Sequence, residues 1–305
     1  PVARLADPQH HLQHENAGRL PPDAAIFGRY FQSKATGLWL YRRKWGAVDG
    51  QPKGVVFVAH GFGEHSGRYD GVAAELNKHG FVVYSMDHVG HGQSEGIRCH
   101  VETFDHYVSD FCQYVANETA TIDPALPRFL LGHSMGGAIA IHVAHRTGRL
   151  WRGVVLSGPL IAPDPDVATP FMKFVAKTLG SWLPQLQLSS LEPEKICSDP
   201  AVVDSYAMDP LNYHAGMRAG MAAATLSAMD FTMDVAAPAF SLPVFIQHGA
   251  KDVVCLPSGS QTFLNAITSD DKTISLYPKA LHEIYLGVER DVVLKDLSAW
   301  LNRRA

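Results

Sequence analysis

An apolar, strand-like run in this chain breaks at a Gly-x-Ser-x-Gly turn and restarts at once as a helix rich in small residues. The turn is residues 132–136 (GHSMG), between the run at 129–131 (FLL) and the small residues at 137–140 (GAIA). In such a nucleophile elbow, a strained strand-to-helix turn holds a serine hydroxyl above the sheet. Glycine suits both ends of the turn because a Cβ there would crowd the neighbouring strand and helix. The pattern therefore predicts Ser134 as a nucleophile.

A second copy of the same pattern occurs at residues 92–96 (GQSEG). It lies in a polar stretch, residues 88–100, and no helix-forming run follows it. Because the strand-to-helix context is what identifies an elbow, we interpret Ser94 as a loop residue.

Composition excludes several classes of protein. A net charge of −4 without a basic block argues against nucleic acid as a partner. No apolar run approaches the roughly 18–20 residues that a membrane-spanning helix needs. The polar start carries no secretory signal pattern, and the four cysteines show no framework spacing, which fits a reducing compartment. We therefore expect a cytoplasmic protein, with residues 1–25 as a flexible tail whose histidines are solvated rather than metal-bound.

Short β-branched runs alternate with helical stretches through most of the chain. In the first half of the chain, apolar runs lie at residues 55–59, 81–86, 129–131 and 153–157, and helical periodicity lies at 69–79 and 104–119. The same pattern resumes near the end of the chain, with strands at 244–246 and 273–277 and helices at 259–267 and 288–301. Continuous apolar runs separated by helices indicate buried parallel strands. Two further strands, 28–32 and 38–44, are expected as an antiparallel pair at one edge. The fold class is thus α/β, a mostly parallel sheet flanked by helices.

The alternation stops for about 80 residues between Pro159 and Pro243. Proline-rich turns, an apolar helix at 171–182 and an Ala/Met-rich stretch at 217–229 replace it. A structureless loop of that length is uncommon, so an inserted helical cap over the active face is expected. The domains are accordingly a core at 26–159 and 243–305, with the cap at 160–242.

A serine hydroxyl needs a base, and the base needs an acid that orients it. In α/β-hydrolases these follow the serine in the order acid, then histidine. His282 is the one histidine beyond the strand at 244–246 and its turn, and it follows the strand at 273–277 across a short loop. Asp252, just past the preceding strand, is the expected acid, with Asp164 and Asp166 as rivals.

The tetrahedral intermediate also needs hydrogen-bond donors aimed at its oxyanion. One expected donor is the backbone N–H of Met135, directly after the nucleophile. The second is the N–H of Phe62, which lies between two glycines directly after the strand at 55–59. His60, in the same loop, is interpreted as structural.

Three long stretches together resemble the monoacylglycerol lipase family of serine hydrolases: residues 60–69 (HGFGEHSGRY), 87–96 (DHVGHGQSEG) and 132–140 (GHSMGGAIA). The resemblance runs from about residue 28 to residue 301. It implies an α/β-hydrolase fold with Ser134, Asp252 and His282 as the triad and Phe62 and Met135 as oxyanion donors.

The resemblance also implies that Glu64, Arg68 and Tyr206 lie at the glycerol end of the site. A buried ion pair between Glu64 and Arg68 is an equally good interpretation. Tyr285 stands where the family has a histidine, and we place it with the substrate-binding residues. Phe62 stands where the family has a small alanine, so the entry for the acyl group beside the oxyanion hole is expected to be tighter.

The expected reaction is hydrolysis of monoacylglycerols to glycerol and fatty acid through an acyl-enzyme, without a metal or organic cofactor. The alternatives are a lysophospholipase, or a broad carboxylesterase or acyltransferase, because the triad is indifferent to the leaving group. The apolar residues between 171 and 186, flanked by Lys173 and Lys177, suggest that the cap touches membranes or lipid droplets transiently. Packing within the cap itself would also explain them. Oligomeric state stays open.

Overall fold

The computed structural model describes residues 28–46, 50–162, 170–188 and 192–305. The predicted tail and the rival acids Asp164 and Asp166 lie outside these residues. No helix within these ranges is long and apolar enough to cross a membrane.

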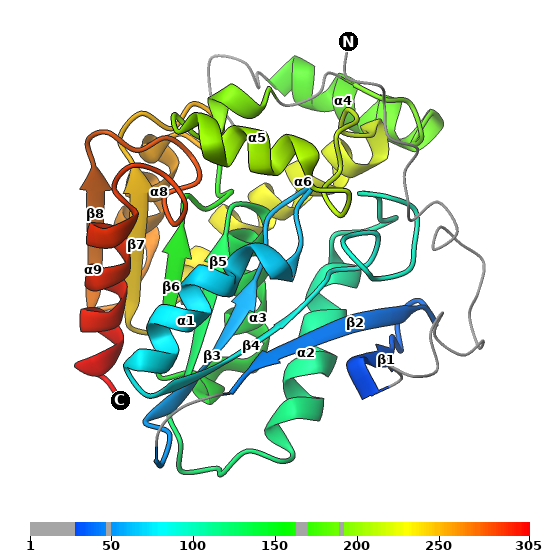
Figure 1. The fold of residues 1–305 in the computed structure, drawn as a ribbon. Coiled ribbons are helices and arrows are strands. Elements are labelled where there is room, and N and C mark those ends of the chain that lie inside the picture. Colours follow the sequence, from blue (N-terminus) through cyan, green and yellow to red (C-terminus); the bar gives the residue numbers. More distant parts are fainter. Residues whose placement is uncertain (1–27, 47–49, 163–169, 189–191) are drawn as a thin grey trace.

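The described strands form one sheet in the order β1-β2-β4-β3-β5-β6-β7-β8 (Figure 1). Their bounds are β1 Tyr30–Gln32, β2 Trp39–Trp45, β3 Gly54–Ala59, β4 Phe81–Met86, β5 Arg128–His133, β6 Gly153–Ser157, β7 Val244–Gly249 and β8 Lys272–Tyr277. β1 and β2 pair antiparallel at one edge, β2 pairs antiparallel with β4, and every pair from β4 to β8 is parallel. The predicted α/β fold with its antiparallel edge is confirmed.

Helices cover both faces of the sheet because β3 to β7 are apolar on both sides. α1 (Asp70–Lys78) and α9 (Arg290–Asn302) lie on one face, and α2 (Asp105–Thr119), α3 (Met135–Thr147) and α8 (Pro257–Ala266) lie on the other. Each layer of side chains between helices and sheet forms its own hydrophobic cluster. Burying one large apolar side chain contributes about 1.5–3 kcal/mol relative to leaving it exposed. These two clusters hold the carboxyl ends of the strands, and the loops that follow them, in place.

Among the described residues between β6 and β7, the regular elements are helices joined by turns and loops, with one isolated bridge between Gln187 and Arg218. These helices are α4 Pro170–Trp182, η5 Pro193–Lys195, α5 Pro200–Met208, α6 Ala219–Phe231, η6 Thr232–Ala236 and α7 Ala237–Ala239. In Figure 1, α4 and α5 lie at the end of the molecule toward which the arrows of β6, β7 and β8 point. The treatment of 160–242 as a separate cap stays a prediction.

α5 was not expected from the sequence. Its start is marked by Asp199, whose carboxylate accepts a hydrogen bond from the Ala201 N–H at 3.0 Å, and by Pro200 at the first helical position. An acidic N-cap followed by proline is a helix-start signal, and it could have located this helix.

Candidate active site

Ser134 sits between β5 and α3 with φ 53° and ψ −121°, a backbone conformation that side chains other than glycine rarely adopt. Its N–H donates to the Ser157 carbonyl at 3.0 Å, and its own carbonyl accepts from Gly137 at 2.8 Å. A Cβ built on Gly136 would lie 2.0 Å from the Ala59 carbonyl oxygen. The turn therefore closes only with glycine there, as predicted, and it leaves the serine in a strained position.

Asp252 and His282 lie in the loops after β7 and β8, and the structure brings them together. His282 Nδ1 is 2.7 Å from Asp252 Oδ2, and both side chains are buried. With Nδ1 donating to the carboxylate, the neutral ring keeps its lone pair on Nε2. The ring can thus accept a proton on Nε2 while Asp252 holds its orientation.

Asp252 is surrounded by donors. Oδ1 accepts from the N–H groups of Val254 and Cys255 at 2.8 and 3.0 Å, and Oδ2 also lies 3.1 Å from His248 Nε2. Burial alone would raise the pKa of Asp252, but His282 and His248 hold it well below its usual value. The carboxylate is therefore ionised. His248 was missed as a site residue, although it stands four residues before Asp252, in the turn expected after the strand at 244–246.

The electrostatics around His282 favour its protonated form. Burial would lower the pKa of His282, but Asp252, followed by Glu283 and Glu64, raises it above the usual value. The ring of His133 lies 4.7 Å from that of His282, and burial lowers the pKa of His133 to about 4. His133 is thus neutral near pH 7 and does not oppose a positive charge on His282.

Cys255 is a neighbour of Ser134. The Ser134 side chain lies within hydrogen-bond reach of its thiol, which is buried. Burial and the Asp252 charge raise the pKa of Cys255, so the thiol stays protonated at neutral pH.

The two expected oxyanion donors come from neighbouring strands. Met135 is the first residue of α3, so its N–H has no carbonyl partner within the helix. Phe62 follows β3, which pairs with β5 up to Ala59 and Gly132. A Cβ built on Gly61 would lie 3.3 Å from the Ser134 Cβ, so this loop passes directly beside the elbow.

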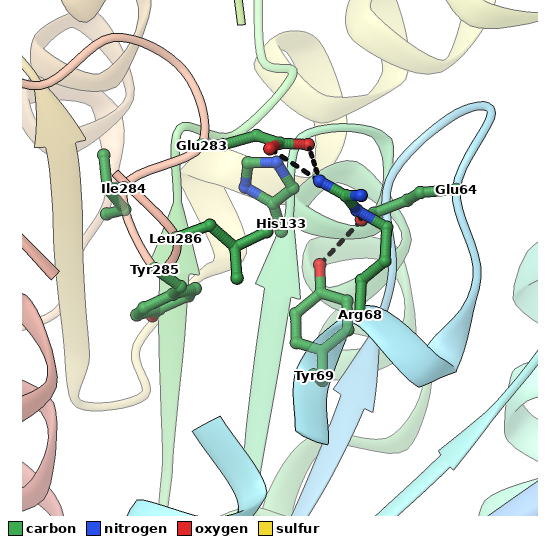
Figure 2. Close-up of a pocket in the computed structure, with 8 residues that line it drawn as sticks. All are labelled: Glu64, Arg68, Tyr69, His133, Glu283, Ile284, Tyr285 and Leu286. Carbon is green, nitrogen blue, oxygen red and sulfur yellow. Dashed lines mark hydrogen bonds and ion pairs between the residues drawn. The ribbon is translucent and has the colours of Figure 1, made fainter. Parts of the chain in front are cut away.

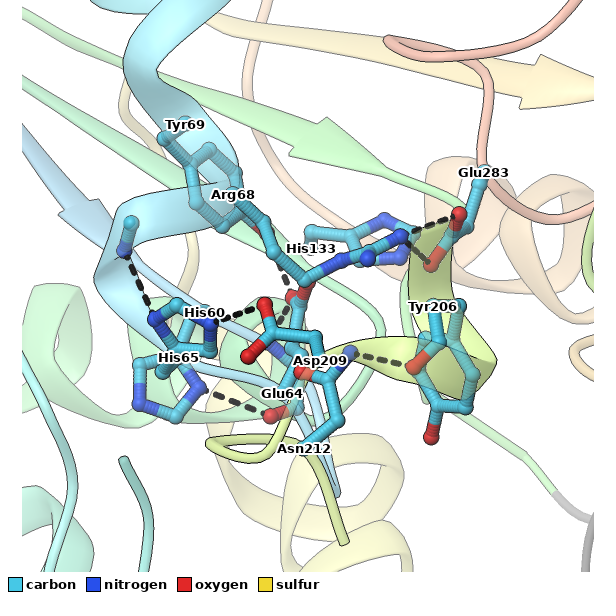
Figure 3. Close-up of polar contacts among 12 residues, drawn as sticks. His60, Glu64, His65, Arg68, Tyr69, His133, Tyr206, Asp209, Asn212 and Glu283 are labelled. Carbon is cyan, nitrogen blue, oxygen red and sulfur yellow. Dashed lines mark hydrogen bonds and ion pairs between the residues drawn. The ribbon is translucent and has the colours of Figure 1, made fainter. Parts of the chain in front are cut away.

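The residues predicted at the glycerol end form a buried polar cluster (Figures 2 and 3). The Arg68 Nε lies 3.3 Å from Glu64 Oε2, and the Arg68 guanidinium stands 5.0 Å from the centre of the Tyr206 ring. A small pocket, partly open to solvent, is lined by Glu64, Arg68, Tyr69, His133, Glu283, Ile284, Tyr285 and Leu286. The ion pair between Glu64 and Arg68 is present.

Tyr285 lines the same pocket, but its hydroxyl donates to the Gln247 side chain at 2.9 Å and its ring packs in the hydrophobic cluster below α1 and α9. Its role in substrate binding stays a prediction. Glu283, which sequence reasoning missed, accepts two hydrogen bonds from Arg68. Glu283 directly follows His282, the expected base, and that position could have identified it as a site residue.

The second Gly-x-Ser-x-Gly copy is structural. Ser94 is fully buried, donates to the Asp87 carbonyl at 2.5 Å and accepts from the Tyr41 N–H at 2.9 Å. His60 is also buried and accepts from the His88 N–H at 3.0 Å. Both side chains hold loops together, as the sequence indicated.

Comparisons with known proteins show which proteins this chain resembles, and monoacylglycerol lipases are among them. The family Hydrolase_4, described as serine aminopeptidase S33, matches residues 50–290. A monoglyceride lipase of Homo sapiens is 37% identical over 272 residues, 88% of this chain and 89% of the relative. A monoacylglycerol lipase of Mycolicibacterium smegmatis is 36% identical over 253 residues, 83% of this chain and 89% of the relative. The crystal structure of a Paleococcus ferrophilus monoacylglycerol lipase superposes with a TM-score of 0.77 at 32% identity, covering 87% of this chain and 99% of that one.

Proposed function

This chain belongs to the monoacylglycerol lipase family of serine hydrolases, and from that membership we propose that it cleaves monoacylglycerols to glycerol and a free fatty acid. The observation that carries the proposal is the likeness to monoglyceride lipases along 83 to 88% of the chain. A buried Asp252–His282 pair and a serine at an elbow support it, because ester hydrolysis by a serine triad requires these three residue types. These relatives do not favour a lysophospholipase, a broad carboxylesterase or an acyltransferase.

In the first half of the reaction, the Ser134 hydroxyl attacks the ester carbonyl while His282 Nε2 takes its proton. Asp252 holds the tautomer and stabilises the imidazolium that forms. The N–H groups of Phe62 and Met135 donate to the oxyanion of the tetrahedral intermediate. His282 then returns its proton to the leaving glycerol oxygen, which leaves Ser134 acylated.

In the second half, water attacks the acyl-enzyme by the reverse proton path. His282 takes a proton from water, and Ser134 leaves as the alcohol when His282 returns that proton. The products are the fatty acid and the free enzyme. Because His282 carries out each proton transfer, the proposed scheme needs no metal or organic cofactor.

The test compares rates on 2-oleoylglycerol, dioleoylglycerol, oleoyl-lysophosphatidylcholine and a short-chain nitrophenyl ester. We expect the highest kcat/KM for 2-oleoylglycerol, and for Ser134→Ala a loss of about 10³-fold or more without loss of fold. Labelling by a fluorophosphonate should be stoichiometric and absent in Ser134→Ala. Retained activity in that variant would refute the triad. Equal or better rates on the lysolipid would refute the substrate assignment.

Contact with lipid surfaces is a second part of the proposal. The stretch at the end of α4 and after it exposes large apolar side chains: Trp182 (83% exposed), Leu183, Leu186 and Leu188. Exposed apolar residues gathered in one stretch are typical of interaction surfaces. Trp182→Asp combined with Leu183→Asp should reduce co-sedimentation with liposomes, whereas Val292→Asp, at an exposed position of α9, should not. Unchanged co-sedimentation of the double variant would contradict this contact.

A further inference from the structure

Glu64 ties together the loop that carries Phe62. Its Oε1 accepts hydrogen bonds from the Gly61 N–H at 2.5 Å and from the Tyr69 hydroxyl at 2.8 Å. Burial alone would raise the pKa of Glu64, but His133 and Arg68 lower it below the usual value, so the group is an anion. A buried anion that accepts the Gly61 N–H holds the peptide directly before Phe62 by a charge-assisted hydrogen bond.

Arg68 connects this loop to the loop of the base. While its Nε lies 3.3 Å from Glu64, its Nη2 donates to both carboxylate oxygens of Glu283 at 2.7 Å. Glu283 directly follows His282, 215 positions along the chain from Arg68. Figure 3 shows Arg68 between the two carboxylates. One guanidinium therefore links the two loops on which Phe62 and His282 lie.

The three side chains are almost completely desolvated. The side chains of Arg68, Glu64 and Glu283 are 6, 7 and 7% exposed. Buried ion pairs add little to stability on average, because desolvation offsets the attraction between the charges. This cluster also holds one carboxylate more than its single guanidinium can neutralise. The second carboxyl group is therefore not explained by a contribution of the cluster to stability.

Both carboxyl groups of the cluster act on the base. Burial raises the pKa of Glu283, and the Arg68 guanidinium opposes that rise and favours the anion. The groups that act on His282 are Asp252 first, then Glu283 and Glu64, while the neighbouring His133 is neutral at pH 7. His282 must become an imidazolium in the transition state, so a fixed negative charge nearby stabilises that state more than the ground state.

We infer that Glu64, Arg68 and Glu283 form a bridge that positions the oxyanion loop (residues 60–64) against the base loop (residues 278–287), with Glu283 as a positioning residue of the reaction. The inference rests on the proposed roles of Phe62 and His282. It differs from the prediction that Glu64 and Arg68 contact the glycerol head group, because a bridge acts on every ester substrate.

Glu283→Gln separates these two roles when it is assayed on 2-oleoylglycerol and on a nitrophenyl ester that has no glycerol. The bridge predicts a loss in kcat of about tenfold to a hundredfold on both substrates, with KM nearly unchanged, because geometry at the reacting atoms is disturbed. A rise in KM on 2-oleoylglycerol alone would overturn the inference in favour of head-group binding. The matched control is Asp271→Asn, which removes a carboxylate that accepts hydrogen bonds from Arg304. Asp271 lies directly before β8, at the end of that strand away from His282. This variant should leave the rates on both substrates unchanged.

Two further measurements exclude a merely structural role. Glu283→Gln should move the acid limb of kcat/KM to lower pH, since it removes one of the charges that raise the pKa of His282. The double variant Glu64→Gln/Glu283→Gln should lose less activity than the product of the single losses, because either change breaks the same bridge. An unmoved acid limb together with multiplicative losses would overturn the inference.

The labelling experiment distinguishes a wrong triad from a wrong bridge. Fluorophosphonate labelling that persists in Ser134→Ala would remove the triad, whatever the bridge variants do. Labelling confined to Ser134, combined with substrate-specific or multiplicative losses, would overturn the bridge alone.

Discussion

Gly158 lies after β6, directly against the pair formed by Asp252 and His282. Its φ is +46°, and a Cβ built there would lie 3.2 Å from His282 Nδ1 and 3.3 Å from Asp252 Oδ2. These are the two atoms whose hydrogen bond measures 2.7 Å. Gly158→Ala should therefore perturb this hydrogen bond without changing any group proposed to take part in the chemistry.

The expected loss has two parts. A positive φ costs a side chain other than glycine about 1–3 kcal/mol of folding free energy. Gly148 isolates that cost, because its φ is +51° and nothing lies within 4 Å of a Cβ built there. The crowding at Gly158 moves His282 or Asp252 by a few tenths of an ångström. Because a displacement of 1 Å can cost about a hundredfold in rate, we expect kcat to fall about tenfold.

The assay measures kcat on a short nitrophenyl ester, corrected for competent sites by fluorophosphonate titration, with urea unfolding in parallel. Both alanine variants should lose similar stability, and only Gly158→Ala should lose turnover per competent site. Equal kcat in the two variants would refute the reasoning that Gly158 leaves room for the pair.

Three other predictions follow from the strained serine and the buried carboxyls. Ser134→Gly should be more stable than Ser134→Ala by about 1 kcal/mol in thermal unfolding, since φ of 53° suits glycine; equal stability would argue against strain. Burial raises the pKa of Asp110 to about 7, so the folded wild type loses stability as pH rises from about 4 to about 7. The free energy of unfolding of Asp110→Asn, measured in urea, should therefore increase relative to that of the wild type as pH rises through this range. A difference between the two proteins that does not change with pH would contradict this prediction. Asp252 raises the pKa of His282, so the acid side of the pH profile of kcat/KM should have its midpoint above 6.5, the usual histidine value. The residual activity of Asp252→Asn should show a lower midpoint. An unchanged midpoint in that variant would contradict the pairing of Asp252 with His282.

The elements of the sheet could be predicted because their signals are local. Alternation of apolar runs and amphipathic stretches depends on residues a few positions apart, and it located every strand to within about two or three residues at either end. β7 continues past the predicted run to Gly249, so His248 belongs to the strand rather than to the turn. Its polar residues Gln247 and His248 are buried by α9, α8 and the loops packed on the sheet, which sequence periodicity cannot reveal.

Parts of the site were accessible to the same kind of reasoning. The order of serine, acid and histidine reduces the candidates to few residues because the loops after parallel strands meet at one edge of the sheet. The structure places Asp252 and His282 within hydrogen-bond distance, in the loops where that order puts them. It also adds His248 and Gly158 around the pair, neither of which any motif singled out.

The sequence by itself determined the α/β alternation, the glycine-dependent elbow at Ser134 and the loops that hold Asp252 and His282, since each depends on neighbours along the chain. Only the tertiary structure decided how the buried charges pair. Arg68 could be matched to Glu64 from their spacing, but Glu283 reaches it only because the loops after β3 and β8 fold toward each other. A hydrogen bond between such distant segments is set by the packing of the whole sheet, and no periodicity in the chain carries that information.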